Sequence, residues 1–381
     1  MFVFCKYSFF LSFSGFEEVK GVVLNMSSQR LTRVFPYDLE KLVSRFSRYS
    51  QAPLTIQQLS KLEDTPTPHH SFRFLRKEVP VRLAHILNEF KHLPKNFKCQ
   101  PSVKLVKEWY EDSICEIANY ESRAVSDSAV VDFSASLQKL ADRHVTTVQT
   151  LSRGLMELRD AEGEENISPV IQFFFNRVHT KRIGVRLLIK QHLSLFGPTS
   201  RISAIGLFEP EMNVKNVVED AARSASVLCK HVYSDHPHVK INAVNVINPG
   251  KSIKMSYASP MLYRVIYELV TNSMRATMEK YGPNDLPSID IDIVKGKEDL
   301  CIRVSDLGGG MTLSEMSRMY QYHYTTAPIP DENSKNFVIA GHGYGLPIAR
   351  VYAQYFGGDL KVTSIDGYGT QGLVYLKHLG S

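Results

Sequence analysis

The chain has 381 residues, a formal net charge of +6 at pH 7 and an apolar content of 43%. This length predicts two domains of ordinary size, each able to bury its own core. No apolar run reaches the roughly 18–20 residues that span a bilayer, so we expect no membrane partner. The charge comes without the dense Lys/Arg blocks of a nucleic-acid binder, so we expect no nucleic-acid partner either.

The cysteines are scattered and none belongs to a Cys-x-x-Cys pair. Their odd number and wide spacing predict free thiols in a reducing compartment, without a disulfide scaffold or a zinc site. They are Cys5, Cys99, Cys115, Cys229 and Cys301.

The first 33 residues read as an N-terminal extension. The chain begins with the apolar and aromatic run MFVFCKYSFFLSFSGF. From Met26 it continues as MSSQRLTRVF, which is rich in Ser and Arg, and no acidic residue occurs between Met26 and Asp38. This second composition is typical of a mitochondrial transit segment. Two alternatives stay open: an extension with no targeting role, and a true start at Met26.

From about residue 60 to residue 196 the apolar pattern is helical. The first predicted helix opens at Pro80 and the second at Pro101, because proline is favoured at the first helical position. Their apolar faces carry Leu83, Leu87 and Phe90 in the first helix, and Val103, Val106, Trp109 and Tyr110 in the second.

The third predicted helix is one continuous element over residues 133–158, and the fourth runs from Ser168 and Pro169 to about Phe196. His144 falls within the apolar stripe of the third, where we expect a core histidine and no metal ligand. Four long helices with short connections predict a four-helix bundle over residues 34–200.

The fourth helix also carries a basic face, which is either a solvated surface or a docking surface for an acidic protein. Its members are Arg177, Lys181, Arg182, Arg186 and Lys190.

The sequence GPTS at residues 197–200 marks a domain break, and residues 201–381 mix helical and alternating patterns. The long polar stretch 308–341 is predicted to be a mobile lid. The whole predicts an α/β sandwich with one layer of helices on one mixed sheet. We expect helices at residues 213–232, 259–281 and 344–356, and strands at residues 238–246, 289–294, 300–305, 359–365 and 371–376.

Three motifs in residues 201–381 carry chemistry: YELVTNSMRATMEK at 267–280, DLGGGM at 306–311 and GHGYGL at 341–346. Glu268 and Asn272, at i and i+4 of a helix, share one face and can hold a metal ion or a water together. Asn272 offers the oxygen that Mg²⁺ accepts beside phosphates and waters, and Glu268 can take a proton from an attacking hydroxyl. Arg275 can neutralise phosphate charge.

Asp306 follows a predicted strand, where its carboxylate can accept a hydrogen bond from the exocyclic amine of adenine. The glycines at 308–310 let the base approach. Gly341, Gly343 and Gly345 precede a helix, so free N–H groups and the helix N-terminus favour an anion there. The spacing is not that of a dinucleotide fingerprint, because no ribose-binding acid follows.

Together these motifs resemble the Bergerat-type (GHKL) ATP-binding fold of gyrase, Hsp90, bacterial histidine kinases and MutL. Within it, ELVTNSMRAT, SDLGGGM, YHYTTAPIP, GHGYGLPIARVYAQYFGGDL and GYGT are similar to the mitochondrial pyruvate dehydrogenase kinases. PHHSFRFLRKEVPVRLAHIL and PSVKLVKEWY extend the resemblance into the helical part. It runs from about Val34 to the C-terminus.

The resemblance implies an ATP- and Mg²⁺-dependent protein-serine kinase of the mitochondrial matrix that phosphorylates and inactivates the E1α subunit of pyruvate dehydrogenase. It also implies docking of the helical bundle on a lipoyl domain of the E2 core, and a homodimer formed through the C-terminal sheet. Two alternatives are a kinase of the branched-chain 2-oxoacid complex, the nearest cousin, and a nucleotide-binding pseudokinase that acts as a regulatory scaffold.

The resemblance also assigns residues. Glu268 is expected to be the general base, Asn272 the Mg²⁺ ligand, and Asp306 the residue that holds adenine. The remaining nucleotide contacts are expected from Glu268 itself, Arg275, Gly308, Gly310, Thr325, Thr326, Gly341, His342, Gly343, Tyr344, Gly345 and Leu346.

Four features depart from the family pattern. Arg264 stands where a His is usual, four residues before Glu268, and we expect it to hold Glu268 ionised and make it a poorer proton acceptor. Thr271 replaces a Lys, and His342 replaces a Phe. The given sequence ends at Ser381 without the family's acidic-Trp tail, so full kinase activity and activation by E2 are expected to be weaker.

Overall fold

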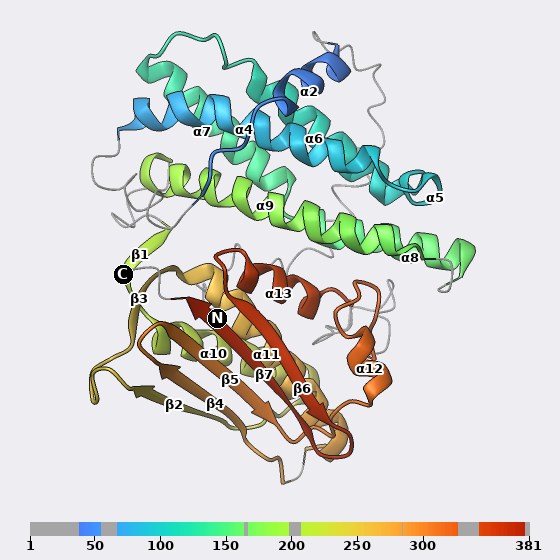
Figure 1. Cartoon of the computed structure of the whole chain (residues 1–381), viewed down its shortest axis with the longest axis vertical. Helices are drawn as coiled ribbons and strands as arrows, with labels where there is room; N and C mark the ends of the chain where they lie inside the picture. The colour runs from blue at the N-terminus through green and yellow to red at the C-terminus, as the bar shows by residue number, and fades with distance from the viewer. Residues whose placement is uncertain are drawn as a thin grey trace. The chain divides into compact units, whose positions relative to one another are not determined.

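The computed structural model describes residues 38–54, 67–163, 167–197, 207–283, 285–326 and 343–377. The described residues divide into two compact units, one ending at Leu207 and the other beginning at Phe208. Figure 1 colours both units in chain order. The predicted extension, residues 1–33, and the break predicted at residues 197–200 lie wholly or largely outside the described residues, so both stay predictions.

The described part of the first unit is helical, as predicted, while its classification as a four-helix bundle stays a prediction. Helix α4 packs against α2, α6 and α9, α6 packs against α8, and α7 packs against α9. The helices are α2 (Leu39–Ser47), α4 (Pro68–Lys91), α5 (Lys95–Lys98), α6 (Pro101–Ala118), α7 (Asp127–Arg143), α8 (Thr147–Glu162) and α9 (Pro169–Phe196).

The helix predicted to open at Pro80 in fact begins twelve residues earlier, so this prediction is wrong. Pro68 is the first residue of α4, and the Thr67 side chain accepts a hydrogen bond from the backbone N–H of His70. A proline inside a helix removes one backbone hydrogen bond. Pro80 is tolerated because the helix buries apolar side chains on both sides of it, including Val79 and Leu83, and this packing outweighs local preference.

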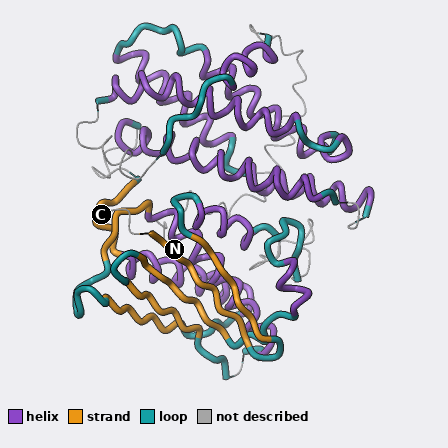
Figure 2. The backbone as a smooth tube through the Cα atoms, viewed as in Figure 1, coloured by secondary structure: helices purple, strands orange, loops and turns teal. Residues whose placement is uncertain are grey.

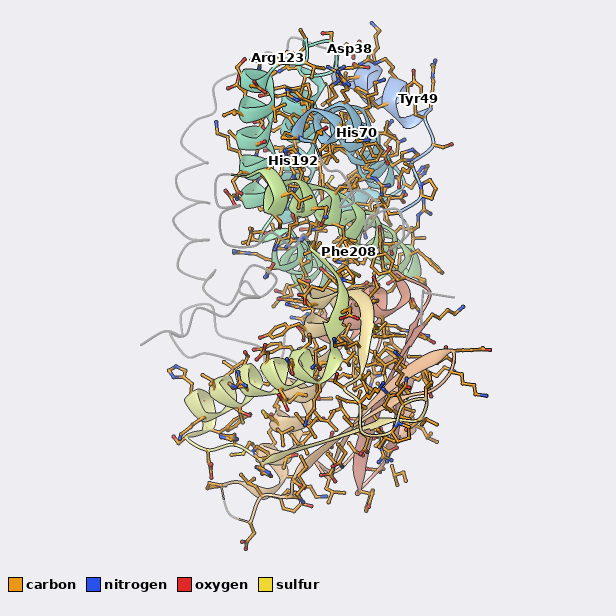
Figure 3. The ribbon with its side chains drawn as sticks, turned by 90° about the vertical axis from the view of Figure 1, so that its left-hand side faces the viewer. Asp38, Tyr49, His70, Arg123, His192 and Phe208 are labelled. Carbon is orange, nitrogen blue, oxygen red and sulfur yellow. The ribbon has the colours of Figure 1, made fainter. Side chains whose placement is uncertain are left out.

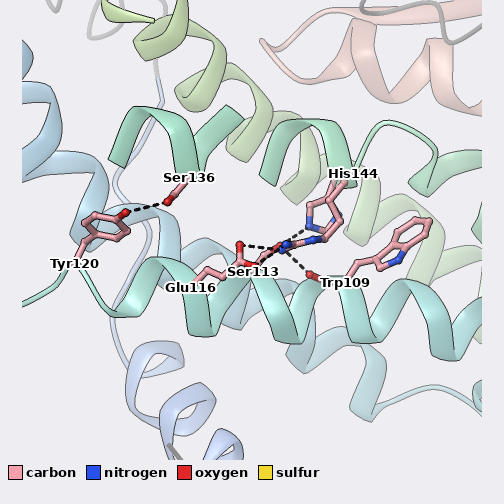
Figure 4. Close-up of polar contacts among 7 residues, drawn as sticks. Trp109, Ser113, Glu116, Tyr120, Ser136 and His144 are labelled. Carbon is pink, nitrogen blue, oxygen red and sulfur yellow. Dashed lines mark hydrogen bonds and ion pairs between the residues drawn. The ribbon is translucent and has the colours of Figure 1, made fainter. Parts of the chain in front are cut away.

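The third predicted helix is interrupted, which corrects the prediction of one continuous element. Helix α7 ends at Arg143, and α8 begins at Thr147. The intervening His144 is buried, as expected of a core histidine, with Nε2 2.9 Å from Ser113 Oγ (Figure 4). The carbonyl of His144 accepts a 2.8 Å hydrogen bond from Arg182. These contacts between distant segments stabilise the break, and the helical period alone does not reveal them.

The basic face of α9 is largely not a solvated surface, which corrects that interpretation. Arg182 is only 6% exposed, and together with Arg186 and Lys190 it lines a small cavity in the helical unit. Lys181 and Arg177 instead pair with Glu89 of α4. The Ser168 side chain caps α9 as predicted, and the helix ends at Phe196.

The second unit contains a mixed five-stranded sheet in the order β2-β4-β5-β7-β6. Strands β2 and β4 are parallel, and the other neighbours are antiparallel, so the predicted mixed sheet is confirmed. Its strands are β2 (Val239–Asn245), β4 (Ile289–Lys295), β5 (Asp299–Asp306), β6 (Asp359–Ile365) and β7 (Gly369–Lys377).

A separate two-stranded sheet was not predicted. Strand β1 (Phe208–Asn213) pairs antiparallel with β3 (Lys254–Ala258), with an irregularity in register between Glu209 and Met212. The sequence FEPEMN of β1 alternates poorly, so it carries little strand signal. Asn213, predicted as the start of a helix, is the N-cap of the next helix.

Helices α10 (Val214–Tyr233), α11 (Ser259–Tyr281) and α13 (Gly345–Gln354) supply the helical layer. Helix α11 packs against β4, β5 and β7, and α13 packs against β6 and β7 (Figure 2). The alternation of apolar and polar residues along β4 gives this strand two different faces. In IDIDIV the isoleucines are buried, whereas the aspartates between them are partly exposed.

The predicted lid contains a short helix, α12 (Leu313–Arg318), so it is not wholly irregular. Thr312 and Glu315 form a capping box that begins this helix. Residues 327–342 of the lid lie outside the described residues. Nowhere in the described part of the chain is a helix long and apolar enough to span a membrane.

Candidate active site

Helix α11 carries the predicted catalytic face and has the bounds that the sequence predicts. Glu268, Asn272 and Arg275 lie on successive turns and are only partly exposed. The positions between them, such as Val270 and Met274, are buried. The helix is therefore fixed by its apolar side while its polar face remains open to a ligand.

Each carboxylate oxygen of Glu268 has a close neighbour. Its Oε1 lies 2.6 Å from Arg264 Nη2, and the two side chains are 16% and 14% exposed. Its Oε2 lies against Gly345, where an added Cβ would stand only 2.3 Å away. The geometry thus brings the predicted base to the predicted phosphate-binding segment.

Asp306 lies at the end of β5 and is buried. Its Oδ2 accepts a 2.7 Å hydrogen bond from the Ser273 hydroxyl, and its Oδ1 accepts one of 2.9 Å from the Gly308 backbone N–H. Burial raises the pKa of Asp306 above its ordinary value, although these hydrogen bonds oppose the shift. Ser273 was missed by sequence reasoning, because only the fold shows that it faces a carboxylate 33 residues away.

The glycines after Asp306 are needed by the protein's own packing. A Cβ on Gly308 would stand 2.6 Å from Ala276 Cβ of α11. Gly310 has φ +71°, and a Cβ there would lie 2.0 Å from the Ile365 carbonyl oxygen. The loop can therefore lie close between α11 and the β6–β7 turn only without side chains at these positions.

Lys280 is a second residue that sequence reasoning missed. Its Nζ donates to the carbonyls of Leu307 and Gly367, each at 3.2 Å. It thereby connects the DLGGGM loop to the GYGT turn from the end of α11. A lone lysine near the end of a helix gives no sequence signal for such a role.

Arg275 reaches the segment that precedes the undescribed part of the lid. Its Nη2 donates a 2.9 Å hydrogen bond to Thr326 Oγ1, and Thr325 is the neighbouring residue. The predicted contacts Arg275, Thr325 and Thr326 are thus near one another.

The start of α13 and the two residues before it contain the described part of the GHGYGL motif, residues 343–346. Gly343 has φ +68° and lies against the backbone of His323 and Tyr324. The buried Tyr344 is the N-cap, and Gly345 and Leu346 begin the helix. Gly341 and His342 lie outside the described residues.

The chemistry of these groups suits a nucleotide with a hard cation. Among the described residues no cluster of three or more His, Cys, Asp or Glu side chains could hold a metal. The amide oxygen of Asn272 fits Mg²⁺ in a site where phosphates and waters supply the other ligands. The Asp306 carboxylate has four lone pairs, and its hydrogen bonds with Ser273, Gly308 and the Thr370 backbone leave it able to accept one more from an amine.

Comparison with known proteins covers both units. Residues 53–218 match the family model described as mitochondrial branched-chain alpha-ketoacid dehydrogenase kinase. Residues 258–379 match the model of histidine kinase-, DNA gyrase B- and HSP90-like ATPases. The second match confirms the predicted ATP-binding fold class.

Curated relatives match over nearly the whole chain. The chain is 41% identical to mitochondrial pyruvate dehydrogenase (acetyl-transferring) kinase isozyme 3 of Homo sapiens, over 90% of this chain and 86% of that protein. It is 38% identical to the corresponding mitochondrial kinase of Ascaris suum, over 92% and 89%. It is 41% identical to isozyme 4 of Rattus norvegicus, over 89% and 84%. The chain therefore belongs to the mitochondrial pyruvate dehydrogenase kinase family.

Proposed function

We propose that this protein is an ATP-dependent protein-serine kinase that phosphorylates the E1α subunit of the pyruvate dehydrogenase complex and thereby inactivates it. One observation carries the proposal: the carboxylate of Glu268 lies against Gly345 at the start of α13. A candidate base and a candidate phosphate-binding turn thus meet in a protein whose relatives are named kinases. Phosphoryl transfer needs mainly positioning, charge stabilisation and a base.

In this proposal Asp306 accepts a hydrogen bond from the adenine amine, and Ser273 and Gly308 orient its carboxylate. Asn272 would hold Mg²⁺, which supplies charge neutralisation to the phosphates when it is bound. Glu268 takes the proton of the substrate serine hydroxyl.

Among the remaining predicted contacts, Gly308 and Gly310 are assigned to the adenine, Thr325 and Thr326 would lie by the nucleotide, and the others would surround the phosphates, with Arg275 supplying positive charge. These remaining contacts are Gly308, Gly310, Thr325, Thr326, Gly341, His342, Gly343, Tyr344, Gly345 and Leu346.

Partners and location follow from the same proposal. The helical unit would act as a four-helix bundle over residues 34–200 that docks on a lipoyl domain of E2, and residues 201–381 would form the kinase domain. The protein would form a homodimer through its sheet and work in the mitochondrial matrix. Sedimentation and a pull-down with isolated lipoyl domains test these two contacts.

The branched-chain complex is the alternative target, since the model matched by residues 53–218 carries that name. We favour pyruvate dehydrogenase because the curated relatives described above are named for it. The regulatory-scaffold alternative is not favoured by relatives that are named kinases.

The test is to incubate the protein with Mg-ATP and with E1 from each complex. We expect phosphoserine on the pyruvate E1, and a loss of kcat of at least about 100-fold in Glu268→Gln with Mg-ADP affinity retained. Glu219→Gln, which removes an exposed acid paired with Lys215 on α10, is the matched control and should leave the rate unchanged. If neither E1 carries labelled serine, under conditions where a related kinase is active, the proposal is refuted.

A further inference from the structure

A largely buried arginine lies directly beside the proposed base. Arg264 is one helical turn before Glu268 on α11, and their side chains form a 2.6 Å ion pair. Both groups are largely withdrawn from water, so their attraction is screened less than that of a surface pair. The exposed pair of Arg223 and Asp220 on α10, 70% and 37% exposed, is the contrasting case.

The surroundings of Arg264 keep it charged. Burial alone would lower the pKa of its guanidinium, but the Glu268 carboxylate opposes this, and the pKa lies above its ordinary value. The phenol groups of Tyr267, Tyr344 and Tyr352 also lie near it. Tyr344 and Tyr352 come from the start and the interior of α13. The surroundings of Arg264 thus include side chains of α13 as well as of its own helix.

The position of Glu268 creates an electrostatic conflict. Its Oε2 lies against Gly345, the first residue of α13, where the helix N-terminus favours anions. The proposed function assigns the nucleotide phosphates to the same turn. Two anions near one helix end repel each other unless a cation compensates one of them.

We propose that Arg264 is a positioning residue that fixes the Glu268 carboxylate over Gly345 and neutralises it there, so that the nucleotide phosphates can approach the same turn. This inference rests on the proposed nucleotide site. Its consequence is that Arg264 supports binding in proportion to the charge of the ligand. A purely structural role would affect charged and uncharged ligands alike.

The test measures the affinity of Arg264→Gln for Mg-ATP, Mg-ADP and adenosine by calorimetry, without a protein substrate. We expect affinity to fall about tenfold for Mg-ATP and about threefold for Mg-ADP, and to stay unchanged for adenosine, because repulsion grows with ligand charge. Arg264→Lys keeps the charge and should recover most of the loss. Arg223→Gln on α10 is the matched control and should not alter any of the three affinities.

A double-mutant cycle separates compensation from direct phosphate contact. In a Glu268→Gln background no carboxylate needs neutralising, so adding Arg264→Gln should change Mg-ATP affinity less than twofold. An equal loss in both backgrounds would mean that Arg264 contacts phosphate itself, and would overturn the inference. So would an equal loss for adenosine and Mg-ATP. Failure of the proposed nucleotide site looks different, because the wild-type protein would then bind none of the three ligands. Failure of the kinase activity alone shows only in the E1 phosphorylation assay and leaves these affinities as they are.

Discussion

The buried histidines of the helical unit and the ion pair at the candidate active site of the ATP-binding unit are two different ways of accommodating an ionisable group away from water. In the helical unit, burial lowers the pKa of His179 to about 3 and that of His192 to about 4, so these side chains are neutral at physiological pH. His144 is shifted in the same direction, well below its ordinary value. In the ATP-binding unit, Arg264 and Glu268 form an ion pair instead.

The difference follows from what each unit must do. A neutral imidazole can accept one hydrogen bond and donate another without the cost of burying a charge. His192, labelled in Figure 3, does this between Ser71 Oγ at 2.7 Å and Ser134 Oγ at 2.9 Å, and so joins three helices.

A carboxylate that acts as a base must be ionised. In the ATP-binding unit the proposed base, Glu268, is accordingly paired with Arg264. Charge pairing is not confined to the ATP-binding unit, since Arg82 and Glu78 form a buried ion pair on α4.

The largest expected effect is a loss of stability confined to the ATP-binding unit. Gly310→Ala should destabilise it by about 3–5 kcal/mol, because the positive φ strains any other residue and the new Cβ would meet the Ile365 carbonyl. Thermal unfolding should show a lower transition for this unit, and nucleotide binding should be lost.

The matched control is Gly367→Ala in the β6–β7 turn, which the Gly310 loop approaches. Gly367 has φ +78°, but nothing lies within 4 Å of an added Cβ. The substitution therefore adds only the strain of a positive φ, and we expect the free energy of unfolding to fall by about 1–2 kcal/mol. Equal losses for the two variants would show that the contact with Ile365 contributes nothing.

The second prediction concerns the neutral histidines. The pKa of His192 is about 4 in the folded protein and 6.5 when exposed, so the unfolded chain binds a proton that the folded chain refuses in this window. Stability therefore falls as pH decreases from 6.5 to about 4, by up to about 1.4 kcal/mol per pH unit for this residue. His192→Asn should flatten the pH dependence of urea unfolding by that amount.

Ser134→Ala provides the control for this experiment. It removes one hydrogen bond to His192 but leaves the histidine in place, so it should lower stability by about 1 kcal/mol without changing the slope. A slope that is unchanged in His192→Asn would contradict the assignment of a neutral buried imidazole.

Sequence patterns predicted those elements that depend on local signals. Ser168 and Pro169 located the start of α9, the alternation in IDIDIV located β4, and the i, i+4 spacing placed Glu268 and Asn272 on one face. Local pattern reports these features because each is encoded within a few residues.

Features that depend on distant partners were not predictable in this way. Pro80 continues a helix because of tertiary packing, and α7 ends at Arg143 where His144 contacts Ser113 of α6. Ser273 and Lys280 join the site only once α11 lies beside the β5 loop. The sequence offered Glu268 and Asp306 as candidate site groups, whereas the hydrogen-bond partners of Asp306 became visible only in the fold.

The smallest expected effect sharpens the comparison at Asp306, where the ATP-binding unit buries a carboxyl group with hydrogen bonds in place of an ion pair. Ser273→Ala removes the donor to Oδ2 and should cost about 1–2 kcal/mol at pH 7. Because burial already raises the pKa of Asp306, the folded protein holds this proton above pH 3.8, and losing Ser273 raises the pKa further. The cost should therefore shrink as pH falls and the carboxyl group becomes protonated.

Ser288→Ala, which removes a 3.1 Å hydrogen bond to the partly exposed Asp290, is the matched control and should cost less than half as much at every pH. A pH-independent loss in Ser273→Ala would mean that the hydroxyl contributes packing alone, and that Asp306 is stabilised by its backbone contacts.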